Sequence, residues 1–185
     1  MIDDERYAEA SDELTRLIAS EPANAGAKYY LGMLHFNQGE FAVATEHFEE
    51  SLKIRPDYFD ACFFVGSCYL NRQMLDKAEK YFEQALKIKD DAFARINLAD
   101  ICIRTSRPNE SEKMYQTVIS ANPDYTEARV GLALVRLAQG KTEDAAEIVN
   151  KVLSENPSNA RARYARSQIL MENRLYSEAL DEAKA

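Results

Sequence analysis

Residues 31–56 read "LGMLHFNQGEFAVATEHFEESLKIRP". Apolar side chains recur every three or four residues before and after "NQGE", and this spacing predicts two short amphipathic helices. Gly32 lies inside the first helix, where a glycine costs about 1 kcal/mol relative to alanine. A glycine there indicates that another helix packs closely against it, because close approach increases burial and dispersion contacts and so offsets the cost.

The same arrangement recurs along the chain with a period of 34 residues. Pro22 and Pro56 are 34 residues apart, as are Pro123 and Pro157, and Asp90 stands where the next proline is expected. The second helix of each period carries a small residue at the same place: Ala44, Ala78, Ser111, Ala145 and Ala179. Two amphipathic segments in every period predict a protein built from repeated helix pairs.

These residues resemble the tetratricopeptide repeat (TPR) family, whose pattern is L-G-x2-Y, then A-x3-F, then proline. The tryptophan that this family often carries near the start of the repeat is absent. The resemblance implies an all-α, right-handed solenoid of antiparallel helix pairs along the whole chain. The matching residues are Leu31, Gly32 and His35 in the first full repeat and Val65, Gly66 and Tyr69 in the second.

We expect one array over residues 1–185. Since a solenoid needs polar outer faces at its ends and neither end supplies one, we expect this chain to be part of a longer array. The divisions are 1–24 for the second helix of an incomplete repeat, 25–58, 59–91, 92–125 and 126–159 for full repeats, and 160–185 for a truncated repeat.

Two repeats depart from the pattern. Pro108 opens a second helix, which is compatible with a helix because proline is tolerated in the first turn. Arg166 stands where leucine is expected, so its guanidinium needs a partner or a path to water. The helix glycine itself is replaced by other small residues in the later repeats, which indicates a limit on size. The five residues at this place are Gly32, Gly66, Ala99, Ala133 and Ser167.

A second stripe of side chains lies on another face of the first helices, about 120° round the helix axis. One interpretation is that this stripe packs against the neighbouring repeat. The resemblance implies another, because first helices of TPR arrays line a concave groove that binds peptides or partner helices. The candidate groove residues are Tyr29, Met33, Phe36, Asn37, Phe63, Ser67, Leu70, Asn71, Ile96, Asp100, Ile103, Arg104, Val130, Leu134, Leu137, Tyr164 and Gln168.

Charge and composition exclude several kinds of partner. The net charge of −8 argues against nucleic acid, which needs a concentrated basic surface. No apolar run is long enough for direct membrane insertion. The carboxylate clamp of chaperone-binding TPR proteins needs basic residues where this chain has Tyr29, Met33 and Phe63, so we do not expect that activity. The groove lining predicts a hydrophobic or amphipathic segment of a partner protein.

No pattern of catalytic or metal-ligating residues was found, so we expect no enzyme activity, no metal and no cofactor. We expect His35 to be a satisfied core residue and His47 to be solvated on a helix surface. Cys62, Cys68 and Cys102 form no CxxC pair and are expected to be buried as small apolar residues. Free buried thiols favour a reducing compartment such as the cytoplasm, whereas a periplasmic location would need a signal upstream.

The sequence therefore predicts a non-catalytic scaffold for protein–protein interaction. The alternative is an accessory or assembly segment of a larger enzyme, or of a bacterial secretion or exopolysaccharide export machine. Self-association is a further expectation, because the two ends differ in charge. Residues 1–24 hold 7 acids and 2 bases, whereas residues 160–185 hold 4 acids and 5 bases.

Overall fold

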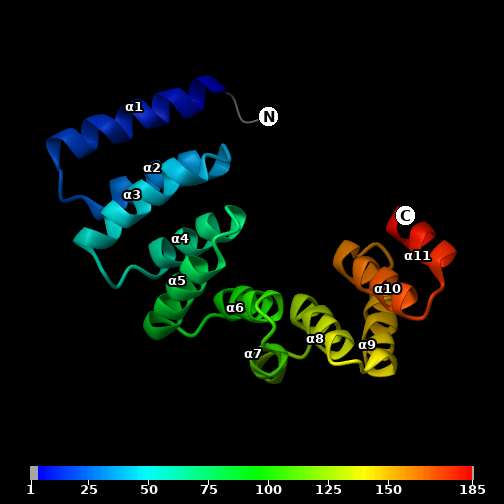
Figure 1. Cartoon of the computed structure of the whole chain (residues 1–185). Coiled ribbons are helices and arrows are strands. Elements are labelled where there is room, and N and C mark those ends of the chain that lie inside the picture. The colour runs from blue at the N-terminus through cyan, green and yellow to red at the C-terminus, as the bar shows by residue number, and fades with distance from the viewer. Residues whose placement is uncertain (1–3, 185) are drawn as a thin grey trace. The chain divides into compact units, whose positions relative to one another are not determined.

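The computed structural model describes residues 4–184, and within that range every regular element is an α-helix. The chain divides into two compact units, one up to Ala94 and one from Arg95 onward. Figure 1 shows the succession of helices along the chain. The helices are α1 (Asp4–Ser20), α2 (Ala25–Asn37), α3 (Phe41–Ile54), α4 (Phe59–Asn71), α5 (Leu75–Ile88), α6 (Ala92–Arg104), α7 (Pro108–Ala121), α8 (Thr126–Ala138), α9 (Thr142–Glu155), α10 (Ala160–Glu172) and α11 (Tyr176–Lys184).

Consecutive helices pack as hairpins. In the first unit α2 packs on α3, α3 on α4 and α4 on α5, and α1 covers α2. In the second unit α8 packs on α7 and α9, and α10 packs on α8, α9 and α11. Because α2 ends at Asn37 and α3 begins at Phe41, the short turn forces the two helices to run antiparallel. Pro108 is the first residue of α7, as predicted for a proline in a first turn.

Each turn between the two helices of a pair contains one residue in the left-handed conformation. The backbone N–H of Gly39 donates to the Phe36 carbonyl at 3.0 Å, and that of Glu40 donates to the His35 carbonyl at 2.9 Å, which is the Schellman pattern of a helix end. Only two of the five residues are glycine, so the turn is imposed on other residue types in three repeats. The five φ values are 77° at Gly39, 60° at Gln73, 60° at Ser106, 76° at Gly140 and 61° at Arg174.

The interpretation of the helix glycines as close-packing positions is confirmed at Gly32 and Gly66. A Cβ on Gly32 would lie 2.7 Å from ring carbons of Phe48, and one on Gly66 would lie 3.0 Å from the ring of Phe82. Both phenylalanines are fully buried. A third close approach was not predicted, because a Cβ on Gly131 in α8 would overlap the ring of Tyr115 in α7.

The two units have different cores. The first is built around aromatic rings, with Phe48 and Phe82 fully buried. The second has an aliphatic cluster from α8, α9 and α10 that includes Val130, Val149 and Ile169. The three cysteines are buried and form no disulfide with one another, as the sequence predicted.

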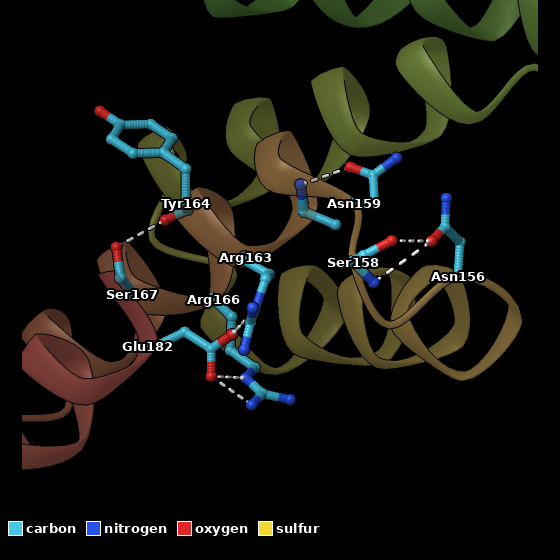
Figure 2. A network of polar contacts seen from close by, with 9 residues as sticks. Asn156, Ser158, Asn159, Arg163, Tyr164, Arg166, Ser167 and Glu182 are labelled. Carbon is cyan, nitrogen blue, oxygen red and sulfur yellow. Dashed lines mark hydrogen bonds and ion pairs between the residues drawn. The ribbon is translucent and has the colours of Figure 1, made fainter. Parts of the chain in front are cut away.

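Arg166 finds its partner in α11. Its Nε donates to Glu182 at 2.8 Å, its second guanidinium nitrogen also donates to Glu182, and Arg163 Nε donates to the other carboxylate oxygen at 3.0 Å (Figure 2). Burial alone would raise the pKa of Glu182, but the hydrogen bonds from the two arginines outweigh it and lower the pKa. The ion pairs therefore fasten α11 to α10.

The first described helix does not present an apolar outer face. From Arg6 onward the exposed residues of α1 are polar, charged or alanine, whereas Leu14, Leu17 and Ile18 are partly covered. The partly covered side of α1 is the side that faces α2, on which the helix packs.

Candidate partner-binding surfaces

The aromatic candidates of the first unit pack against other rings, two of them across the junction between repeats. The ring centroid of Phe64 in α4 lies 6.1 Å from that of Tyr29 and 5.1 Å from that of Phe36, both in α2. Phe63 lies 5.6 Å from Phe82 in α5. Contact with the next repeat thus explains one edge of the Tyr29 and Phe36 rings, whereas the contact of Phe63 with Phe82 lies within its own repeat. Tyr29, Phe36 and Phe63 nevertheless remain partly exposed, so their outer edges are accessible.

Beside these rings lie aliphatic and amide side chains. Met33 and Leu70 are partly exposed, and Asn37 and Asn71 are exposed. The Nδ2 of Asn71 donates to the Ser67 carbonyl at 2.9 Å, and the Ser67 hydroxyl donates to the Phe63 carbonyl at 3.0 Å, so both groups already bond to α4 itself. We call these residues the α2/α4 surface: Tyr29, Met33, Phe36, Asn37, Phe63, Ser67, Leu70 and Asn71.

The candidates of the second unit have more varied environments. Ile96 and Val130 are buried, with 6% and 0% of their surface exposed, so they support the fold and present no binding surface. Leu134 and Leu137 pack against the aliphatic core. The remaining candidates are Ile103, Asp100 and Gln168, which are partly exposed, and Arg104 and Tyr164, which are exposed.

Asp100 belongs to a polar network that sequence analysis did not predict. Its carboxylate accepts a hydrogen bond from the buried Tyr115 hydroxyl and another from Arg161 at 2.5 Å, and Arg161 also lies 3.4 Å from the Tyr115 hydroxyl. Burial and the adjacent Asp100 carboxylate raise the pKa of Tyr115. An aspartate within an apolar stripe was the signal that a partner existed, but nothing in the repeat pattern pointed to Arg161.

The two histidines lie against each other. The Nδ1 of His35 lies 2.6 Å from Glu40, and the His35 and His47 rings stack with centroids 5.2 Å apart. His47 is partly buried, and burial followed by the adjacent His35 lowers its pKa. The prediction that His47 is simply solvated is wrong, because the ring lines a pocket of about 320 Å³ where α1 covers α2 and α3.

Within residues 4–184 the acidic, cysteine and histidine side chains do not gather into any cluster of three that could hold a metal ion. Burial raises the pKa of the Cys62 and Cys68 thiols to about 11, so these thiols are protonated near neutral pH. In the same range, none of the helices has the length and apolar character needed to cross a membrane.

Stacked helix pairs, a small residue inside the first helix and a left-handed residue in the turn define an α-helical repeat protein. The tetratricopeptide repeat profiles match residues 2–59, 35–99, 103–169 and 136–185. The chain belongs to the tetratricopeptide repeat family. Proteins of this family are in general non-catalytic interaction scaffolds.

Solved structures show the same fold. A tetratricopeptide repeat protein from Parabacteroides merdae superimposes with a TM-score of 0.76 at 22% identity over 97% of this chain and 70% of its own. YrrB, described as a TPR protein with an unusual peptide-binding site, gives 0.74 at 21% identity over 94% of this chain and 91% of its own. MamA from Desulfovibrio magneticus gives 0.76 at 21% identity over 83% and 87% of the two chains. No curated protein sequence matches this chain significantly.

Proposed function

We propose that this chain is a non-catalytic scaffold that binds a hydrophobic or amphipathic segment of a partner protein on the α2/α4 surface. The observation that carries the proposal is the combination of accessible apolar side chains on two successive first helices. Met33 in α2 and Leu70 in α4 are partly exposed, and the rings of Phe36 and Phe64 pack together where these two helices meet. Apolar groups on a rigid support favour binding because little conformational entropy is lost.

The polar side chains at the edge of this surface can form hydrogen bonds with the backbone of a bound peptide, whether the peptide is extended or helical. The amides of Asn37 and Asn71 are exposed one repeat apart at equivalent places. Each amide carries donors and an acceptor, so it can bond a peptide group, and the Asn71 amide does so in exchange for its bond to the Ser67 carbonyl. The solved structure described as having an unusual peptide-binding site supports the class of ligand.

The experiment is selection from a random peptide display library on the intact protein, followed by anisotropy measurements with the selected peptides. Met33→Glu and Leu70→Glu place a charge in the apolar contact, and each is expected to weaken binding at least tenfold, or about 1.4 kcal/mol. Phe36 is avoided because its ring packs on Phe64, so its loss would also affect stability.

Val43→Glu is the matched control. Val43 is an exposed apolar residue of the same unit, but it lies on the second helix α3. This variant is expected to bind the peptides as the unmodified protein does. Equal loss in all three variants would show nonspecific adsorption, and unchanged affinity in Met33→Glu and Leu70→Glu would rule out the α2/α4 surface.

A further inference from the structure

A pocket of about 320 Å³ lies in the first unit, between α1, α2 and α3. Ile18 of α1 and Leu31 of α2 form its apolar wall, and the stacked rings of His35 and His47 form another part of its lining. The pocket lies between helices that pack on one another, so it is not the outer face of a first or last helix. None of its residues belongs to the α2/α4 surface, and it is therefore a separate site.

A similar hollow occurs one repeat later, between α3 and α5, with a volume of about 280 Å³. The repeat relates the two hollows, because equivalent positions of the helices line both of them. Four residues of the second hollow stand 34 positions after residues of the first: Glu49 after Thr15, Leu52 after Ile18, Tyr81 after His47 and Gln84 after Glu50. The second hollow therefore shows which contacts these positions can form.

At the second hollow, one carboxylate joins two stacked rings. The rings of Tyr69 and Tyr81 stack with centroids 5.7 Å apart, and their hydroxyls donate to Glu49 Oε1 at 3.1 and 2.9 Å. Tyr69 and Tyr81 are the counterparts of the two histidines. The rings of His35 and His47 stack in the same way, with centroids 5.2 Å apart. A pair of ring donors at this place thus takes one carboxylate as its acceptor.

At the first pocket, the sequence supplies no carboxylate at the corresponding place. Thr15 stands where the next repeat has Glu49, and its side chain is shorter and uncharged. His47 is partly buried, yet its ring forms no hydrogen bond with any of residues 4–184. His35 bonds through Nδ1 to Glu40, which leaves its Nε2 without a partner in that range. Because a partly buried polar group is stabilised by a partner, the pocket beside these rings indicates a ligand that supplies the acceptor.

The other charged groups at the pocket are already paired. Glu50 lies 2.6 Å from Lys28 Nζ, and Glu40 lies 2.6 Å from His35 Nδ1. These pairings neutralise both carboxylates, so neither one attracts a cation strongly. Across residues 4–184, acidic, cysteine and histidine side chains form no group of three that could hold a metal ion. The pocket therefore favours an anion.

We propose that this pocket binds a small carboxylic acid with an apolar body. The carboxylate lies where Glu49 lies in the next repeat and accepts hydrogen bonds from His47 and from the Thr15 hydroxyl. The apolar body packs against Ile18 and Leu31. Hydrogen bonds between charged groups are about twice as strong as those between neutral groups. A pocket of about 320 Å³ accommodates an aromatic ring that bears one carboxylate, so benzoate is the probe.

Binding is coupled to the protonation of His47. Burial, and then the adjacent His35, lower the pKa of His47 below its ordinary value, so the ring is neutral near pH 7. Three further charged groups act on the ring less strongly, two raising its pKa and one lowering it: Glu50, Glu46 and Lys28. The residues that α1 contributes to the pocket are uncharged. A bound carboxylate stabilises the protonated ring, so its affinity rises as the pH falls from 7.5 to 5.5, which is still above the pKa of about 4 of a carboxylic acid.

The test is a titration of the isotope-labelled full chain with sodium benzoate at pH 5.5, followed through the amide and imidazole NMR signals. We expect saturable shifts in α1, α2 and α3 and a rise in the pKa of His47. His47→Phe keeps a stacked ring but loses the donor, and it is expected to weaken binding at least tenfold. Benzamide has the same shape without the charge, and as the control ligand it is expected to bind at least tenfold more weakly.

A substitution in α1 tests the geometry without any ligand. Thr15→Glu places a carboxylate where the next repeat has Glu49, so it is expected to raise the pKa of His47 and to prevent benzoate from binding. Thr15→Gln is the matched control, because it has the same length without the charge, and it is expected to leave that pKa nearly unchanged. Thr15 is exposed, so both variants keep the fold, which circular dichroism checks.

Four results would overturn the proposal. They are no saturable shift at millimolar benzoate, equal affinity for benzamide, binding that His47→Phe leaves unchanged, and a pKa of His47 that Thr15→Glu alters no more than Thr15→Gln does. Met33→Glu is expected to bind benzoate as the unmodified protein does. Failure of the α2/α4 surface and failure of the histidine pocket are therefore distinguishable.

Discussion

At the scale of single residues, the turn between the two helices of a pair requires one residue in the left-handed conformation, whatever its type. Gly39 and Gly140 adopt the left-handed conformation without a steric cost, whereas Gln73, Ser106 and Arg174 adopt it with a Cβ. That conformation costs an L-residue roughly 1–2 kcal/mol. Three turns therefore carry local strain. The packing of the surrounding helix pairs holds these residues in the strained conformation.

Ser106→Gly is expected to raise the free energy of unfolding by about 0.5–1 kcal/mol. The steric cost of the left-handed conformation disappears, and the greater entropy that glycine loses on folding offsets only part of this gain. Urea denaturation measures the difference. Ser106→Ala is the control, because alanine keeps the Cβ and gains nothing. A glycine variant no more stable than the alanine variant would show that the turn at Ser106 is not strained.

Gly131→Ala is expected to lower the free energy of unfolding by about 2 kcal/mol, the usual range for overpacking a core. The new methyl group overlaps the ring of Tyr115, which is fully buried and held by Asp100 and Arg161, so the ring has no free space to move into. Gly26→Ala is the control, since its nearest neighbour would be Asn24 Oδ1 at an ordinary 3.4 Å. Equal effects of the two substitutions would contradict this packing.

At the scale of helices, the sequence predicted the pairs well because their determinants are local. The period of 34 residues, the small residue opposite Phe48 or Phe82 and the proline at the repeat end all lie within one repeat. The site was predicted less well. Whether Val130 is buried and Tyr164 exposed depends on which helix packs against each, and both stand at the same repeat position.

Contacts between distant repeats were the part that could not be predicted. The ion pair of Arg161 with Asp100 joins residues 61 positions apart, which is not a whole number of repeats. A repeat pattern relates equivalent positions, whereas this contact joins two different positions of different repeats. The need for a partner at Arg166 could be predicted, because an arginine in a core face must be paired or reach water. The sequence did not identify Glu182 as that partner.

Glu182→Gln is expected to loosen α11 at neutral pH by about 2 kcal/mol, the scale of hydrogen bonds to a charged group. The folded-state pKa of Glu182 is lowered, so its contribution is fully present above the ordinary pKa near 4.5 and is lost as pH falls through the folded-state value. Hydrogen exchange in α11 at pH 7 measures the effect, and denaturant unfolding extends the comparison to acid, where the two proteins are expected to converge. A difference that persists in acid would exclude the charge as its cause.

At the scale of the whole molecule, the chain consists of two compact units, each with its own core. Phe48 and Phe82 are fully buried in the first, whereas Val149 and Val152 have at most 1% of their surface exposed in the second. In repeat proteins each repeat is stabilised mainly by its neighbours, so a change in one place has local consequences. The α2/α4 surface lies in the first unit, and this predicts that it is insensitive to mutations in the core of the second.

Phe82→Leu and Val149→Ala test this independence. Each removes buried apolar volume and is expected to cost roughly 1–3 kcal/mol. Because local unfolding follows the stability of the surrounding cooperative segment, Phe82→Leu should reduce amide protection in α2 to α5, and Val149→Ala should reduce it in α8 to α10. Hydrogen exchange with segment resolution measures both in the intact chain. If either substitution reduced protection equally in both units, the chain would unfold as one cooperative body, and a peptide bound at the α2/α4 surface would then also stabilise the second unit.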